Sequence, residues 1–313
     1  MGRRAGAVSS AAQECVAAGD FYQALQVYHG LCSRAKLAGD VEGKETSAET
    51  IALEGARTLL EHRQWRCASE LLAARLFESW EERSAPFDER AKSTVSELSA
   101  LFPAGCDEQC DFLRRASKCA DSLLQNDEDC RKALHEELAR ALMAHAPPEY
   151  GLAAHHLARA DDAQQYAHLV ELWAPTGFQS ETDLFVCRAC LHLLAMRRAD
   201  AAAHVHQRLC ADDGPLARRA SPDGPTDWRA SPLCRFVDFF LQLVRLAPSL
   251  KPRSAAADIY GVLRQRYAGS LDRDPHLAKL ADHAAGVFLG FSPPKSAGLS
   301  DMLSGLMGMM NGA

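Results

Sequence analysis

The sequence predicts an all-α protein, a right-handed α-solenoid built from antiparallel helix pairs like those of tetratricopeptide and HEAT repeats. Two observations predict this fold. Apolar residues recur at the helical period along most of the 313 residues, and no strand-like alternation persists before residue 211. Short turns separate the predicted helices at a period of about 35–40 residues for each helix pair, which lies in the range of these repeats.

The first part of the chain shows clear helix boundaries. Residues 1–18 are expected to form a flexible N-terminus with a short first helix. Asp20 is expected to cap the second helix, because its carboxylate can accept from a backbone N–H of the first turn. The continuous solenoid should run over 19–292, with an N-terminal half that ends at about residue 145. Its further helices in this half are expected at 48–61, 65–82, 86–102, 107–124 and 127–145.

The middle of the chain is organised around residues 177–196, which follow a helical run over 148–173. Ser180 and Asp183 have the spacing of a helix N-cap and its partner in the first turn. After that turn only Arg188 and His192 are polar. A helix that is apolar on nearly all sides is expected to lie buried between neighbouring helices.

The regular pattern is interrupted at residues 211–232, which contain four prolines and two glycines. Such an insertion is either functional or a mobile loop, and a small β-hairpin is one form that it can take. Helices are then expected at 233–246, at 255–267, and from Asp274, as the cap, to Gly290. Residues 293–313 form a Met-rich amphipathic tail that either docks on this chain or binds another molecule.

Composition narrows the function classes. The net charge of −6 argues against a nucleic-acid partner, which would need clustered Lys and Arg side chains. The eleven cysteines are odd in number and irregularly spaced, so we expect reduced, buried thiols in a reducing compartment. Met1–Ser10 lacks the apolar core of a secretory signal, and we expect a cytosolic protein without direct membrane insertion.

No catalytic constellation is found, so the sequence predicts neither an enzyme nor a cofactor. Cys187-x-x-Cys190 with His192 is the most suggestive metal-ligand pattern, but His192 points away from the two thiols and no fourth ligand has suitable spacing. We interpret the pattern as close-packed core and keep a metal or redox protein as a third hypothesis. The His155-His156 pair, and His204 with His206, are interpreted as solvent-facing or capping residues.

Several segments resemble a known family. Gly177-Phe-Gln-Ser-Glu-Thr-Asp-Leu-Phe-Val is similar to the Gly-Phe-x-Ser-Glu-x-Asp-x-Phe-Val segment of the α-solenoid subunit of the guided-entry-of-tail-anchored-proteins (GET) pathway. This is the family of Golgi-to-ER traffic protein four, also called the transmembrane-domain recognition complex subunit. Further matches are Gly19-Asp-Phe-Tyr-Gln-Ala, Pro232-Leu-Cys-Arg-Phe and Pro293-Pro-Lys295 with the tail that follows it.

The resemblance implies a non-enzymatic scaffold of the pretargeting complex for tail-anchored proteins, which are inserted into the ER membrane. Its N-terminal half would bind the cytosolic targeting ATPase. Its C-terminal half would hold a partner with a ubiquitin-like domain, which engages a tetratricopeptide co-chaperone. The alternative is a helical-repeat adaptor subunit of another cytosolic assembly.

The resemblance also implies two sets of binding residues. The ATPase side is expected at Asp20, Tyr22, His29, Arg34 and Glu70, with His29 standing where the family has arginine. The side that faces the ubiquitin-like partner is expected at Trp228, Phe236, Phe239, Phe240, Tyr267, Asp274 and Phe288. For any one phenylalanine of this second set, the alternative is simple packing in the core.

Overall fold

The computed structural model describes residues 2–39, 47–123, 127–211, 220–221, 224–225, 231–252 and 254–292. The chain divides into two compact units, Met1–Leu169 and Val170–Ala313. Helices make up nearly all of the regular structure in both units, so the predicted all-α class is confirmed. The handedness of the helix stack stays a prediction.

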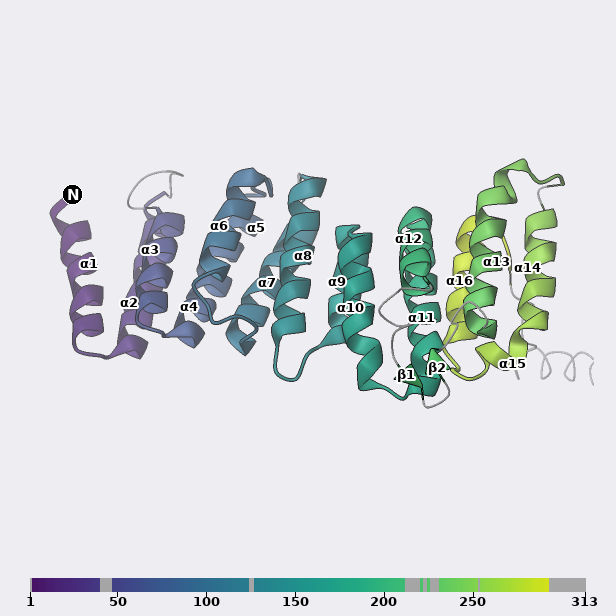
Figure 1. Ribbon diagram of the computed structural model, residues 1–313. Coiled ribbons are helices and arrows are strands. Elements are labelled where there is room, and N and C mark those ends of the chain that lie inside the picture. The colour runs from purple at the N-terminus through teal and green to yellow at the C-terminus, as the bar shows by residue number, and fades with distance from the viewer. Residues whose placement is uncertain are drawn as a thin grey trace, which may run out of the picture. The chain divides into compact units, whose positions relative to one another are not determined.

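Unit 1 is a series of helices in which successive elements pack side by side (Figure 1). Aspartate or serine side chains cap several of its helices by accepting from backbone N–H groups, as Asp20 does from Gln23 at 3.0 Å. Its elements are α1 (Gly2–Ala17), α2 (Phe21–Leu37), α3 (Ala48–Glu61), α4 (Trp65–Leu71), η1 (Leu72–Phe77), α5 (Glu78–Glu82), α6 (Glu89–Ser99), α7 (Asp107–Ser122), α8 (Glu128–Ala144), α9 (Tyr150–Ala160) and the first part of α10 (Ala163–Trp173).

The helix predicted over 65–82 is continuous but not uniform. Its central segment, η1, is a π-helix, whereas α4 before it and α5 after it are α-helical. A π-helical turn accommodates an extra residue and is often found at functional sites. The segment contains Arg75, whose side chain contacts α2 as described below.

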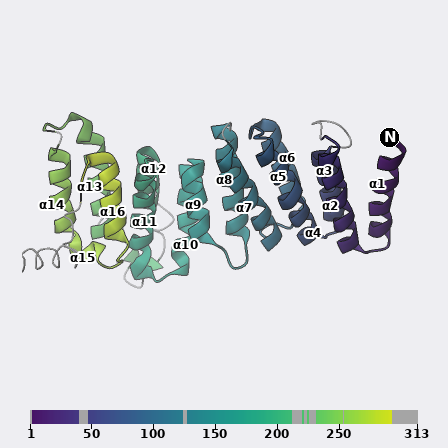
Figure 2. The same ribbon diagram turned by 180° about the vertical axis from the view of Figure 1, so that it is seen from behind.

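Unit 2 is arranged around α11 (Thr182–Ala195), which packs against α12, α13 and α16 (Figure 2). This confirms the expected burial of the apolar helix between neighbours. The other elements of unit 2 are η2 (Ala174–Thr176), η3 (Gln179–Glu181), α12 (Ala199–Leu209), β1 (Ala220–Ser221), β2 (Gly224–Pro225), α13 (Pro232–Leu246), η5 (Ala247–Ser249), α14 (Ala255–Arg266), α15 (Ala268–Leu271) and α16 (Leu277–Leu289).

Two predicted caps in unit 2 are wrong. Ser180 lies in the 3₁₀ turn η3, and α11 begins after Glu181 without a side-chain cap. Asp274 does not cap α16, which begins at Leu277; it accepts instead from the N–H of His276 at 2.9 Å. Gly290 ends α16 in the left-handed conformation, as predicted for the end of the helical array.

The insertion at 211–232 contains β1 and β2, which pair antiparallel with Ser221 opposite Gly224. This is the small β-hairpin that the sequence analysis allows for at this place. The predicted Met-rich tail, 293–313, lies outside the described residues. Among the helices that the structure describes, none is long and apolar enough to cross a membrane.

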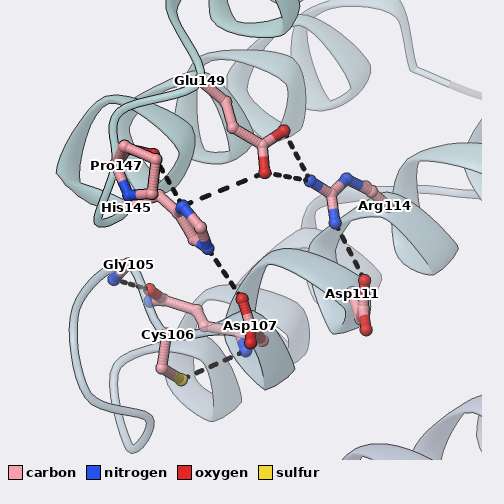
Figure 3. Close-up of polar contacts among 9 residues, drawn as sticks. Gly105, Cys106, Asp107, Asp111, Arg114, His145, Pro147 and Glu149 are labelled. Carbon is pink, nitrogen blue, oxygen red and sulfur yellow. Dashed lines mark hydrogen bonds and ion pairs between the residues drawn. The ribbon is translucent and has the colours of Figure 1, made fainter.

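A polar cluster in unit 1 joins the start of α7 to the turn between α8 and α9 (Figure 3). Arg114 on α7 donates to both Asp111 and Glu149, at 2.8 and 3.0 Å. His145, which follows the last residue of α8, contacts Asp107 in the first turn of α7. These contacts hold α7 against the turn between α8 and α9 through charged hydrogen bonds, in addition to apolar packing.

Candidate protein-binding surfaces

The expected ATPase side lies on α2 and the helix from α4 to α5. His29 on α2 accepts at Nδ1 from the Nε–H of Arg75, at 2.9 Å. Burial and the positive charge of Arg75 lower the pKa of His29, although Glu70 acts in the opposite direction. The structure therefore brings His29 near Glu70 and against Arg75, an arginine that the sequence analysis did not single out.

A group of ion pairs follows about two helical turns further along α2. Lys36 Nζ lies 2.8 Å from Glu82 and 3.3 Å from Glu78, both on α5. Arg75 also approaches Glu78, at 3.9 Å. Because acids surround its cations, this surface presents mixed charges rather than a positive patch. We call Tyr22, His29, Lys36, Glu70, Arg75, Glu78 and Glu82 the charged surface of unit 1.

The remaining residues expected on this side have different roles. Tyr22 is 68% exposed, so most of its ring is available to a partner. Asp20 caps α2, which uses its carboxylate within the helix. Arg34 is exposed and folds back to donate to the Gly30 carbonyl of its own helix, at 3.1 Å. Among the described residues, no carboxylate forms an ion pair with Arg34.

In unit 2 the phenylalanines of α13 separate into core and surface. Phe236 and Phe240 are fully buried, and their rings contact those of Tyr267 and Tyr260, 5.8 and 5.1 Å away. This places both in the core, the alternative left open for every phenylalanine of the region. Phe239, between them in sequence, points outward and is 48% exposed.

Three other large apolar side chains on α13 and α14 are exposed, and the sequence analysis missed them. Leu246 on α13 and Ile259 and Val262 on α14 are 55%, 47% and 70% exposed. The two helices pack against each other, so large apolar groups are exposed on both members of one helix pair. We call these three residues and Phe239 the apolar surface of unit 2. The sequence does contain a signal for them, because Phe239 and Leu246 are seven residues apart on α13, and Ile259 and Val262 are three residues apart on α14.

The other residues expected on this side are distributed as follows. Tyr267 follows the last residue of α14 and is half-buried against Phe236. Asp274 is buried and accepts from Arg188 on α11, which makes it a packing residue of unit 2. Phe288 is half-buried on α16. Trp228 lies outside the described residues.

The Cys187-x-x-Cys190 pattern lies in the buried interior of α11. Burial raises the pKa of both thiols, which disfavours the thiolate that a metal requires. Within the described ranges, no group of three or more His, Cys, Asp or Glu side chains is arranged to hold a metal ion. The geometry there is that of a packed core.

Comparison with known proteins identifies the family of this chain. A family model for Golgi to ER traffic protein 4 matches residues 42–310. This chain belongs to that family. The family membership agrees with the resemblance found in the sequence.

Individual relatives are similar over nearly their whole length. The Golgi to ER traffic protein 4 homolog of Dictyostelium discoideum is 25% identical over 294 residues, which cover 94% of this chain and 86% of that protein. The homolog of Homo sapiens is 25% identical over 94% of this chain and 83% of that protein. The crystal structure of C. therm. Get4 matches with a TM-score of 0.70 at 18% identity, over 96% of this chain and 95% of that one.

Proposed function

We propose that this chain is a cytosolic, non-enzymatic scaffold of the GET pathway. It would bridge the targeting ATPase for tail-anchored proteins and a partner with a ubiquitin-like domain, and through that partner a tetratricopeptide co-chaperone. Such a bridge acts by raising the local concentration of two partners that otherwise meet by diffusion. Membership of the Golgi to ER traffic protein 4 family supports this role.

The observation that carries the proposal is that the two candidate surfaces differ in chemistry and lie on different units. The charged surface of unit 1 suits a polar partner, and its ion pairs favour specificity over tight binding. The apolar surface of unit 2 suits an amphipathic helix, which would bury Phe239, Val262 and their neighbours. One surface for each partner is what a bridge requires.

Calorimetric titration of the purified chain with each partner tests the proposal. Replacing Phe239 and Val262 together with serine is expected to weaken binding of the ubiquitin-like partner by roughly tenfold or more, as loss of buried apolar anchors does. Binding of the ATPase should not change. Leu152→Ser is the matched control, because Leu152 is similarly exposed but lies on α9 of unit 1.

The ATPase side is tested with Tyr22→Ala and Arg34→Glu, which remove an exposed ring and reverse an exposed charge. Both should weaken ATPase binding and leave the ubiquitin-like partner bound. Arg197→Glu, at an exposed position in unit 2, is the charge-reversal control. A chain that binds neither partner would contradict the proposal. Recovery of only unrelated subunits from its own cytosol would favour the alternative, an adaptor of another assembly.

A further inference from the structure

The end of α12 and the start of α13 bring two thiols together. Cys210 follows the last residue of α12, and Cys234 lies in the first turn of α13. Their side chains hydrogen-bond to each other. The two residues are 4% and 1% exposed, so water competes little for this contact. They also flank the 211–232 insertion, and a bond between them would close that segment into a loop.

A histidine is positioned at this thiol pair. His206 lies one turn before Cys210 on α12, and its Nε2 is 3.1 Å from the carbonyl oxygen of Cys234. A carbonyl oxygen only accepts, so Nε2 carries the proton and the other ring nitrogen of the neutral imidazole is an acceptor. The imidazole also hydrogen-bonds to the Cys210 thiol. His206 is therefore oriented by one backbone group and lies beside one thiol.

The local electrostatics assign different roles to the two cysteines. Burial alone would lower the pKa of His206, but the Cys210 thiol and the Cys234 carbonyl outweigh it and raise the pKa, which makes the imidazole a better base. The hydrogen bond with Cys210, together with burial, raises the pKa of Cys234. Cys234 therefore keeps its proton, and His206 lies beside the thiol of Cys210.

The thiols also border a space that is large enough for a small reagent. Cys210, Cys234 and His206 all line a cavity of about 710 Å³ between α12 and α13, with Arg235, Asp238 and Gln242 around it. A volume of this size is many times that of a water molecule, so a peroxide fits beside the thiols. Buried thiols elsewhere differ. Cys119, for example, donates to the Phe77 carbonyl at 3.8 Å, and this cavity does not reach it.

We propose that Cys210 and Cys234 form a redox-sensitive pair that a hydroperoxide converts into a disulfide. His206 takes the Cys210 proton, and the thiolate sulfur attacks one peroxide oxygen while the O–O bond breaks. The leaving oxygen takes a proton to give an alcohol, or water from hydrogen peroxide, and Cys210 becomes a sulfenic acid. The Cys234 sulfur then attacks the Cys210 sulfur, the S–O bond breaks, and the departing hydroxide takes the Cys234 proton to leave as water. Two thiols thus supply the two electrons that the peroxide accepts.

The test is peptide mapping of the intact, fully reduced chain after exposure to hydrogen peroxide. Remaining thiols are alkylated, the chain is digested without reductant, and cross-linked peptides are identified by mass spectrometry. The expected result is one major cross-link, between Cys210 and Cys234. His206→Asn should form it at least about tenfold more slowly, because general-base assistance is lost. Cys119→Ser is the matched control and should form it at the wild-type rate.

Two further variants separate the roles of the thiols. In Cys234→Ser, a sulfenic acid should persist on Cys210 and be captured by a cyclic 1,3-diketone reagent. In Cys210→Ser, Cys234 should stay reduced at the same peroxide concentration. Circular dichroism checks that each variant keeps its helix content. Two results would overturn the proposal. One is a major cross-link from Cys190 to Cys210. The other is that Cys210 and Cys234 are still alkylated, and therefore reduced, after peroxide has oxidised the more exposed Cys15 and Cys67.

Discussion

His145 Nε2 lies 2.7 Å from Oδ1 of Asp107, which fastens the end of α8 to the first turn of α7 (Figure 3). The other ring nitrogen, Nδ1, lies 2.8 Å from the Pro147 carbonyl oxygen and 3.9 Å from a Glu149 carboxylate oxygen. Both nitrogens therefore face acceptors, and the doubly protonated imidazolium satisfies both. The Asp107 carboxylate, followed by the Pro147 carbonyl, raises the pKa of His145.

This geometry predicts that His145 stabilises unit 1 at acid pH. Because its pKa is higher in the folded chain, the contribution is fully present below the ordinary value of about 6.5 and is lost as pH rises through the raised pKa. His145→Gln should thus lower the thermal midpoint most at acid pH and least at alkaline pH. Thermal unfolding of the variant and the wild type from about pH 5.5 to about pH 8.5 measures this difference in midpoint. His204→Gln, at an exposed position of α12, is the matched control.

The His135–His156 pair predicts the opposite pH dependence. The two Nδ1 atoms are 3.1 Å apart, and burial lowers the pKa of His135 to about 4 and that of His156 to about 3. Asp121 counteracts this at His135, whereas Arg159, Arg131 and His155 add to it. The contribution of the two histidines to the free energy of unfolding is fully present above their ordinary pKa of about 6.5. It is lost as pH falls toward the lower pKa values of the folded chain.

Between about pH 7 and pH 5 the expected loss is on the order of 2 kcal/mol for each histidine. His156→Gln should remove part of this acid sensitivity. Urea unfolding at the two pH values measures it, as the difference in the free energy of unfolding. An equal difference in the variant and the wild type would contradict the assignment.

Phe239 and Phe240 are adjacent in sequence but should differ sharply when truncated. Phe240→Ala leaves a cavity beside Tyr260 and Phe236 and should lower the free energy of unfolding by about 3–5 kcal/mol. Phe239→Ala removes a half-exposed ring and should change it by no more than about 0.5 kcal/mol. Urea unfolding of both variants checks this. Similar losses in both would show that the outward position of Phe239 is wrong.

Asp183 is buried at the start of α11 and accepts from Arg273 and Ser231, each at 2.7 Å. Asp183→Asn removes the charge that these donors face and should cost about 1–3 kcal/mol, since the partly exposed Arg273 can regain water. Asp200→Asn, at an exposed position of α12, is the matched control. No difference in unfolding midpoint between the two variants would exclude a stabilising role for the ion pair.

Helix positions were predictable where local chemistry decides them. Residues 48–61 form a helix with the predicted bounds, and Asp20 caps α2, because both depend on neighbours in sequence. The predictions at Ser180 and Asp274 failed for a long-range reason. Asp183 is held by Arg273, and Asp274 by Arg188, so both carboxylates belong to tertiary ion pairs. Sequence spacing alone contains no information about such partners.

The histidines show the same limit. His156 and His206 were interpreted as solvent-facing or capping, but the first contacts buried His135 and the second contacts the Cys210 thiol and the Cys234 carbonyl. The candidate surfaces were predictable only in part. Tyr22 and Phe239 are exposed as a binding role requires, whereas Arg75, Ile259 and Val262 emerge only from the packing. Burial on one face of a helix depends on which neighbours cover it.

The π-helical segment Leu72–Phe77 gives the helix from Trp65 to Glu82 a change of phase. One residue of an α-helix corresponds to a rotation of about 100°, so a single extra residue turns all later side chains by roughly that angle. Deleting one residue within this segment would restore a uniform α-helix while rotating α5 against α4. Glu78 and Glu82 would then lose their ion pairs with Lys36. Natural variation in the length of this segment would therefore change the charge pattern of the surface without any substitution.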